Sequence, residues 1–123
     1  MRLGDLEVYC LSREAERNAW KIFKRLDWDI KKSMGLQWIR SVDSVGANIA
    51  EGFGRFHYLD KNKFNYNSRG SLLEAVHWTE LLLERGFIST EESEVILALF
   101  RRVHIMLNNY INVTKQQSKQ QSK

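Results

Sequence analysis

Apolar residues recur at steps of three and four along most of the chain, which is the spacing of one face of an α-helix. The pattern predicts four amphipathic helices over residues 6–25, 33–54, 61–85 and 90–113. The last of them carries the expected core seam Val95, Leu99, Val103, Met106 and Tyr110. Because the connections are short, we expect an all-α protein folded as an antiparallel up-down-up-down four-helix bundle.

The ends of the expected helices carry their own signals. Asp60 is placed to cap the third helix, and Gly86 is placed to stop it in a left-handed conformation. Ser89 and Glu92 have the spacing of a capping box for the fourth helix. Residues 114–123 are a polar repeat of Lys, Gln and Ser after Thr114, so we expect a bundle over residues 1–113 followed by a disordered tail.

Composition agrees with a helical protein and limits its class. Proline is absent, and 28% of the residues are charged, which is typical of a water-exposed surface. No apolar run approaches the roughly 18 residues that a membrane-spanning helix needs. Cys10 is the only cysteine and the N-terminus has no apolar signal segment, so we expect a cytoplasmic protein without a membrane partner.

The net charge of +4 permits a polyanionic partner, and the positive excess lies in residues 1–70 and in the tail. Two groups of residues are candidates for contacts with phosphates. The first is a stripe on the outer face of the first helix, formed by Arg13, Arg17, Lys21 and Lys24. The second surrounds the junction of the second and third helices and consists of Arg55, His57, Lys61, Lys63 and Arg69. Such a stripe is also typical of an ordinary solvated helix face, and Glu14 and Glu16 beside it favour that alternative.

The second and third helices each carry residues off the core face that a monomeric bundle does not require. We expect them to form the contact between copies in a homo-oligomer, although scattered surface apolar groups are the alternative. On the second helix they are Arg40, Ala47, Asn48, Glu51, Gly54 and Arg55. On the third they are Tyr66, Gly70, Leu73, His77 and Leu81. A line of small residues, Gly46, Ala50 and Gly54, is expected to let another backbone approach the second helix.

Residues that suggest chemistry fall short of an active site. Glu74 and His77 have the Glu-x-x-His spacing of di-iron bundles, but such a site needs two of these pairs and two further glutamates, all facing inward. Gly52-Phe53-Gly54 follows a helix and not a strand, so it is not a phosphate-binding fingerprint. We therefore expect no enzyme, no metal and no cofactor.

The run 40–58 reads Arg-Ser-Val-Asp-Ser-Val-Gly-Ala-Asn-Ile-Ala-Glu-Gly-Phe-Gly-Arg-Phe-His-Tyr. It resembles the signature of the 23S rRNA intervening-sequence proteins, which are small bacterial four-helix bundles. Arg69-Gly70-Ser71-Leu72, Glu74 and His77-Trp78 continue the similarity, which covers residues 6–111. Many members of that family have proline where this chain has Gly46.

The resemblance implies a bundle that assembles as a homopentamer, in a family whose function is poorly defined. A similar bundle is the accessory protein of diversity-generating retroelements, where a basic pentamer binds nucleic acid and a reverse transcriptase. Our first hypothesis is a non-enzymatic oligomer that binds structured RNA or DNA through the two basic groups, alone or with another protein of a ribonucleoprotein. The alternative is a purely structural protein-interaction scaffold, in which Arg40 and Arg55 pair with Glu51 or Glu74 across subunits.

The polar members of the run, Asn48, Glu51 and Arg55, point away from the predicted core. We interpret them as part of a self-association surface and not of an active site. Phe56, His57 and Tyr58, at the end of the run, are candidates for stacking on unpaired bases.

Overall fold

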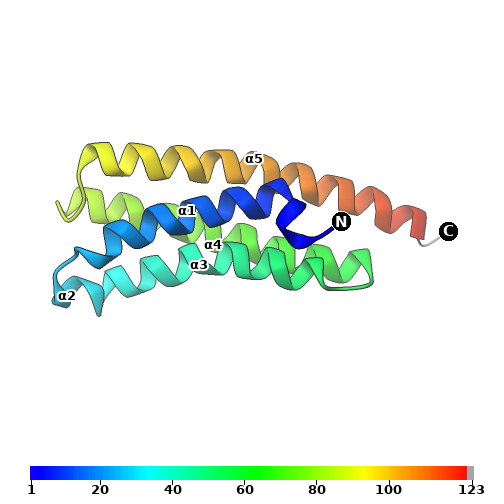
Figure 1. Cartoon of the computed structure of the whole chain (residues 1–123), viewed down its shortest axis with the longest axis horizontal. Coiled ribbons are helices and arrows are strands. Elements are labelled where there is room, and N and C mark those ends of the chain that lie inside the picture. Colours follow the sequence, from blue (N-terminus) through cyan, green and yellow to red (C-terminus); the bar gives the residue numbers. More distant parts are fainter. Residues whose placement is uncertain (122–123) are drawn as a thin grey trace.

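The computed structural model describes residues 1–121, in which four long helices lie side by side (Figure 1). The long helices are α1 (Glu7–Lys24), α3 (Met34–Phe53), α4 (Tyr58–Glu84) and α5 (Thr90–Gln121). The short helices are η1 (Leu3–Asp5), which precedes α1, and α2 (Trp28–Lys31), which lies between α1 and α3. These residues contain no strand, and the expected all-α bundle is confirmed.

Figure 1 shows successive long helices running in opposite directions, and side-chain hydrogen bonds show the same for α3 and α4. Between α3 and α4, the Trp38 indole donates to the Thr79 hydroxyl at 2.9 Å, and the Ser68 hydroxyl donates to the Val45 carbonyl at 2.7 Å. Residue numbers therefore rise along α3 as they fall along α4. Within residues 1–121, no helix is both long enough and apolar enough to cross a bilayer.

Each long helix buries one stripe in a single core, whose largest enclosed side chains include Trp38, Phe100 and Ile49. The predicted seam of α5 is wrong at Val95, which is 52% exposed. The buried apolar residues of α5 are Ile96, Leu99, Phe100, Val103, Leu107 and Ile111. Apolar residues follow one another at 95 and 96, so periodicity alone did not fix the rotation of this helix.

The end of α4 and the start of α5 follow the sequence signals. Gly86 has φ +77°, which is the left-handed conformation expected after a helix. The Ser89 amide donates to the Glu92 carboxylate at 2.9 Å, and the Glu92 amide donates to the Ser89 hydroxyl at 3.1 Å, so the capping box is confirmed. The expected cap by Asp60 is wrong, because α4 begins at Tyr58 and Asp60 lies in its first turn.

The expected disordered tail is wrong for the residues that the structure describes, because α5 continues to Gln121. Thr114 and Ser118 are one helical turn apart, and both are buried. The Thr114 hydroxyl donates to the Tyr110 carbonyl, and the Tyr58 amide of α4 donates to the Gln121 side chain at 3.4 Å. A polar repeat therefore continues the helix by packing small hydroxyl residues inward, which its composition did not reveal. Residues 122–123 of the expected tail lie outside the described residues.

Two glycines of α3 allow close approach by neighbouring helices. A Cβ at Gly52 would lie 2.9 Å from the Lys61 carbonyl oxygen and 3.0 Å from the Phe64 Cβ, both in α4. A Cβ at Gly46 would lie 2.7 Å from the Glu16 carboxylate of α1. The expectation that Gly46 admits a backbone from outside is wrong, because α1 already occupies that side.

Replacing Gly52 with alanine is expected to lower the free energy of unfolding by about 1–3 kcal/mol, because the methyl group meets the backbone of α4. Gly4→Ala is the control, at a glycine outside the predicted subunit contact where a Cβ meets nothing within 4 Å. That variant is expected to change the free energy of unfolding by less than about 0.5 kcal/mol. Urea unfolding followed by circular dichroism measures both, and equal effects would contradict the close packing at Gly52.

Candidate functional site

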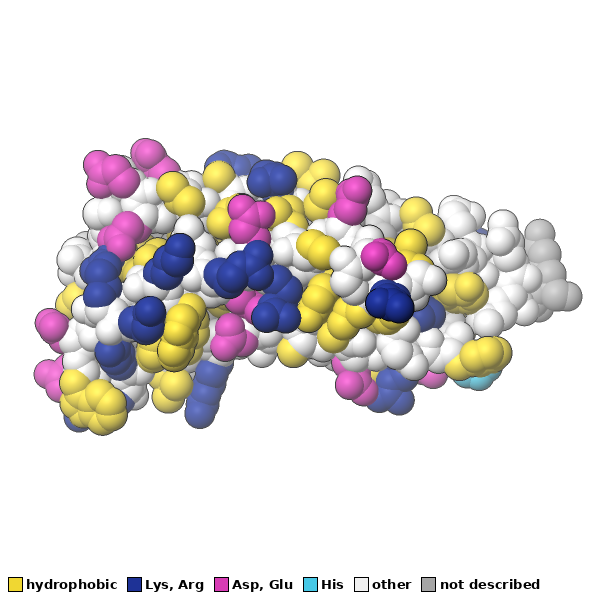
Figure 2. Space-filling view, in the orientation of Figure 1, with side chains coloured by type: hydrophobic (Ala, Val, Ile, Leu, Met, Phe, Trp, Pro, Cys, Tyr) yellow, Lys and Arg dark blue, Asp and Glu magenta, His cyan; other side chains and the backbone are white. Residues whose placement is uncertain are grey.

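The basic residues of α1 lie on its exposed face. Arg13, Arg17, Lys21 and Lys24 are all exposed, and we call this set the α1 stripe. In Figure 2, dark-blue side chains gather over the half of the molecule that holds much of α1, with yellow hydrophobic and magenta acidic side chains among them. The charge at the far end of α5 in this view is sparser.

Three of the four cations of the α1 stripe are unpaired. Arg13 donates to the Tyr9 hydroxyl at 3.0 Å and pairs with Glu16 at 2.7 Å. The Tyr9 hydrogen bond, with the charge of Glu16, raises the pKa of Arg13. Within residues 1–121, Arg17, Lys21 and Lys24 form no ion pair. The charge of Arg17 nevertheless acts on Glu16, and Lys21 lines a hollow with Glu91 and Glu92 of α5. Because none of the three is held in an ion pair, they can still turn to an external anion.

Three residues of the second basic group already make contacts within the bundle. Lys61 donates to the Phe53 carbonyl at the end of α3 (2.9 Å), and burial lowers its pKa. Arg69 is half-buried and donates to Asn108 of α5 at 2.9 Å. Arg55 pairs with Glu51 at 2.7 Å and lies over the Phe64 ring.

Within residues 1–121, the exposed side chains of His57 and Lys63 form no ion pair, although the His57 ring meets Phe56 edge-on with centroids 5.0 Å apart. Figure 1 shows the α3–α4 turn at the end of the bundle opposite the α1–α2 corner. The structure thus does not merge the two predicted groups into one surface. The α1 stripe is the stronger candidate for phosphate contacts.

Two carboxylates lie beside the stripe in the groove between α1 and α3. Glu16 and Asp43 border a hollow of about 150 Å³ that Tyr9, Arg13 and Ala47 also line. Burial raises the pKa of both carboxyl groups, and the nearby Asp43 charge raises that of Glu16 further. Arg13 opposes these shifts without cancelling them. This groove therefore disfavours further negative charge and separates the stripe from α3.

The raised pKa of Glu16 predicts a pH-dependent stability difference. In the folded state its pKa lies above the ordinary value of 4.5, so folding favours the protonated form. That contribution is complete below the ordinary pKa and is lost as the pH rises through the folded-state pKa. The free energy of unfolding of Glu16→Gln, relative to the unmodified chain, is therefore expected to rise from acid to neutral pH.

Urea unfolding across that pH range measures the difference between the two proteins. Glu14→Gln is the matched control, since Glu14 is exposed on the same helix and has no ion pair within residues 1–121. A relative stability of Glu16→Gln that falls with rising pH would show that the ion pair with Arg13 outweighs burial.

The predicted self-association residues lie on the outer sides of α3 and α4, and we call this set the α3–α4 face. Its edges border other helices, because Ala47 lines the hollow against α1, and Tyr66 and Leu73 line hollows against α5. Most of its members are exposed, including Tyr66 at 39% and Leu73 at 54%. The remaining exposed members are Arg40, Ala47, Glu51, Gly54, Arg55, Gly70 and His77. Asn48 is half-buried, and Leu81 packs against the edge of the core.

Polar residues of this face are partly satisfied within their own helix. The Asn48 amide donates to the Ser44 carbonyl at 2.8 Å, and Glu51 pairs with Arg55 one turn later. The Arg55–Glu51 pair thus exists without a second subunit. Arg40 makes no ion pair among the described residues.

Two features escaped the sequence reasoning. Trp20 lies within the α1 stripe, is 51% exposed and stacks on Phe23 with ring centroids 5.4 Å apart. Its spacing from Arg13, Arg17 and Lys24, in steps of three and four, was the signal that could have found it. The second is a buried polar cluster in which Asn65 donates to Asn62, which donates to the Ile111 carbonyl.

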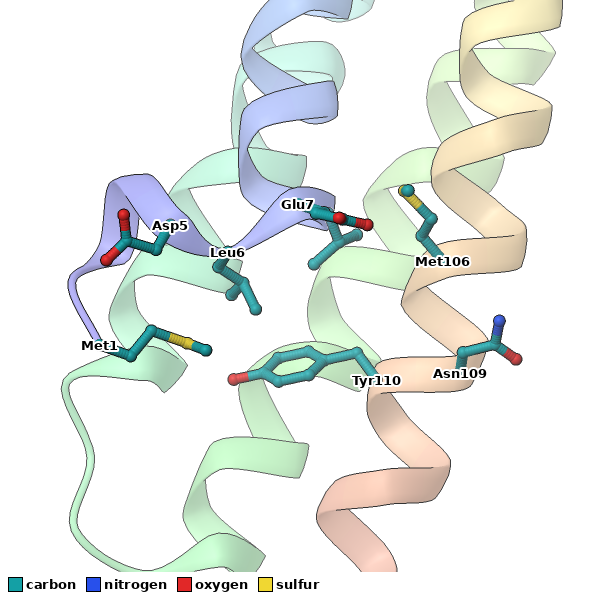
Figure 3. Close-up of a pocket in the computed structure, with 8 residues that line it drawn as sticks. Met1, Asp5, Leu6, Glu7, Met106, Asn109 and Tyr110 are labelled. Carbon is teal, nitrogen blue, oxygen red and sulfur yellow. The ribbon is translucent and has the colours of Figure 1, made fainter.

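Hollows on the surface do not bring reactive groups together. One of about 450 Å³ lies between the N-terminal segment and α5 (Figure 3). Tyr110 reaches across it toward Met1 in that view, and the Asp5 carboxylate at its edge accepts the Arg2 amide. Within residues 1–121, no three His, Cys, Asp or Glu side chains are grouped to hold a metal ion. Glu74 and His77 are both exposed.

Fold and surface together define a four-helix-bundle protein that carries a basic stripe and a mixed polar and apolar face. Residues 4–109 match the profile of the 23S rRNA-intervening sequence proteins, and the chain belongs to that family. It is also similar to a crystal structure from Bacteroides thetaiotaomicron, described as a protein of unknown function from the S23 ribosomal protein family.

The similarity to the Bacteroides protein has a TM-score of 0.79 at 25% sequence identity and covers 85% of this chain and 97% of that one. No curated protein matches this chain. The family membership supports the bundle and leaves the function open.

Proposed function

We propose that this protein is a non-enzymatic, homo-oligomeric helical module of the cytoplasm that binds the phosphate backbone of structured RNA or DNA through the α1 stripe. The observation that carries the proposal is the unpaired state of Arg17, Lys21 and Lys24 on one exposed helix face. Lysine and arginine that replace counterions on a phosphate backbone give binding that does not depend on sequence and weakens with salt.

The geometry of the stripe suits a backbone and not a single anion. Residues 13 to 24 span about 16 Å along α1, given the rise of 1.5 Å per residue. Repetition of the stripe on several copies would extend the surface further, and weak contacts would then act together. The exposed His57 and Lys63 supply a smaller, separate contribution at the other end of the bundle.

Self-association through the α3–α4 face is the second part of the proposal. Gly70 lies in the interior of α4, where a glycine costs about 1 kcal/mol relative to alanine. A Cβ there would meet nothing within 4 Å, so packing inside the bundle does not account for the glycine. The exposed Tyr66 and Leu73 flank it, and a neighbouring copy would bury them. The number of five copies rests on the family resemblance alone.

A purely structural scaffold is the second candidate function. It is favoured by the pairing of Arg13 with Glu16 and of Arg55 with Glu51, because each pair neutralises a cation that a polyanion site would use. Both candidates require assembly, and only the first requires the α1 stripe to bind phosphate.

The triple variant Arg17→Glu, Lys21→Glu, Lys24→Glu separates the two. It is expected to abolish retention of structured RNA and DNA in a gel-shift assay at low salt, because the free cations become anions. The unmodified protein should lose affinity steeply as salt rises. Arg101→Glu, Arg102→Glu, Lys119→Glu is the matched control, with the same change in net charge on exposed positions of α5. No retention by the unmodified protein, or equal loss in both triple variants, would contradict binding through the stripe.

Gly70→Gln tests assembly at the α3–α4 face. Open space around Gly70 accommodates the longer side chain within one bundle, and glutamine is the better helix former, so the bundle itself should not be weakened. A neighbouring backbone would be blocked, so the native mass should fall to that of smaller species. Native mass spectrometry and sedimentation measure this, with circular dichroism as the check on folding. An unchanged mass would place the subunit contact elsewhere.

A further inference from the structure

We infer that the α1 stripe takes an unpaired nucleotide segment, with one base stacked on the exposed indole of Trp20 and the flanking phosphates on Arg17 and Lys24. This inference rests on the proposed nucleic-acid function and specifies its substrate. It assigns a binding role to a tryptophan that contributes nothing to the enclosed core.

The position of Trp20 in the stripe carries the first step. Arg17 precedes it by three residues and Lys24 follows it by four, so the three side chains are neighbours on one face of α1. Neither cation has an ion pair within residues 1–121. A planar apolar surface is therefore bordered along the helix by two free positive charges. That combination matches a base with a phosphate on either side.

The ring is also held in place, which reduces the entropy cost of binding. Trp20 and Phe23 are stacked, with an angle of 21° between their planes. The ammonium group of Lys31 in α2 lies over the Phe23 ring, 6.0 Å from its centroid. Ordering a side chain before the ligand arrives leaves more of the stacking energy for affinity.

Charge identifies the kind of molecule that covers the indole. Glu16 is bound to Arg13 and its charge also interacts with that of Arg17, and Glu91 and Glu92 of α5 line a hollow with Lys21. None of these carboxylates forms an ion pair with Arg17 or Lys24 within residues 1–121, so both cations keep the capacity to bind an external phosphate. A hydrophobic protein segment would have to cover free cations, and a polyanion would neutralise them. Among polyanions, a duplex keeps its base faces inside its own stack, whereas an unpaired strand presents them.

Trp28 provides an internal comparison. It is 71% exposed, more than Trp20, but it lies in sequence between Asp27 and Asp29, which are both exposed. Asp29 pairs with Lys32 at 3.9 Å, whereas Asp27 has no ion pair within residues 1–121, so its carboxylate repels a phosphate beside a base stacked on Trp28. Exposure alone therefore does not make a nucleotide site, and Trp28 serves as the matched control for Trp20.

The test measures the affinity of each variant for a short labelled oligouridine strand and for an RNA duplex of the same length, by fluorescence anisotropy at low salt. Trp20→Ala is expected to weaken binding of the single strand by about 5- to 100-fold, because one base–aromatic stack is lost. Its affinity for the duplex should be unchanged. Trp20→Phe should recover much of the single-strand affinity, and Trp28→Ala should retain all of it.

Three results would overturn the inference while the proposed function stands. The first is an affinity of Trp20→Ala for the single strand that equals that of the unmodified protein. The second is a loss of single-strand affinity in Trp28→Ala or Phe56→Ala as large as that in Trp20→Ala. The third is a change of native mass in Trp20→Ala, which would show that the indole contacts another protein chain. The proposed function fails separately if neither RNA is bound, or if the triple variant of the stripe binds both RNAs normally. Circular dichroism confirms that each variant is folded.

Discussion

Close packing of α3 against α4 at Gly52 is the constraint on which the surfaces of this protein depend. The missing side chain lets the backbone of α4 approach at Lys61 and Phe64, and it fixes how α3 is rotated. With that rotation, Val45 and Ile49 enter the core and Gly46 meets α1. Asn48 and Glu51, on the same helix, are then left on the outside or at its edge. Within the run 40–58, some residues therefore pack inside the bundle and others lie on its surface.

The two candidate surfaces lie on different helices, which allows them to serve different partners. The α3–α4 face combines exposed apolar groups with the Arg55–Glu51 pair and the open position at Gly70. The α1 stripe combines free cations with the Trp20 indole. The partly buried carboxylates Glu16 and Asp43 lie between the stripe and α3. Arg13 of the stripe and Ala47 of the α3–α4 face line the same hollow, so the two surfaces meet at the groove between α1 and α3.

The sequence predicted the features that depend on residues close together in the chain. Helical periodicity identified all four long helices, and the glycine at 86 and the Ser89–Glu92 box marked the α4–α5 connection. It failed where a neighbouring helix decides the outcome. Composition marked residues 114–121 as a tail because it does not show that Thr114 and Ser118 pack inward. Periodicity placed Val95 in the core because two apolar stripes overlap on α5.

The candidate site shows the same limit. Spacing placed the four cations of the α1 stripe on one exposed face. Spacing did not show that Lys61 donates a hydrogen bond to the Phe53 carbonyl, because the turn between α3 and α4 brings the two together. It also did not show that Arg69 donates to Asn108 of α5, because that partner is distant in the sequence. The spacing of Trp20 from the cations of the α1 stripe is visible in the sequence, but its exposure and its stacking on Phe23 are properties of the folded chain.

The central claim is that the α3–α4 face, shaped by Gly52, is the contact between copies of this chain. A crystal structure of the assembled protein tests it most directly, through the burial of Asn48, Glu51 and Gly70. The account predicts that a neighbouring copy covers these residues and lies against the open side of Gly70. An assembly in which all three remain in solvent, with the copies joined through another face, would contradict it.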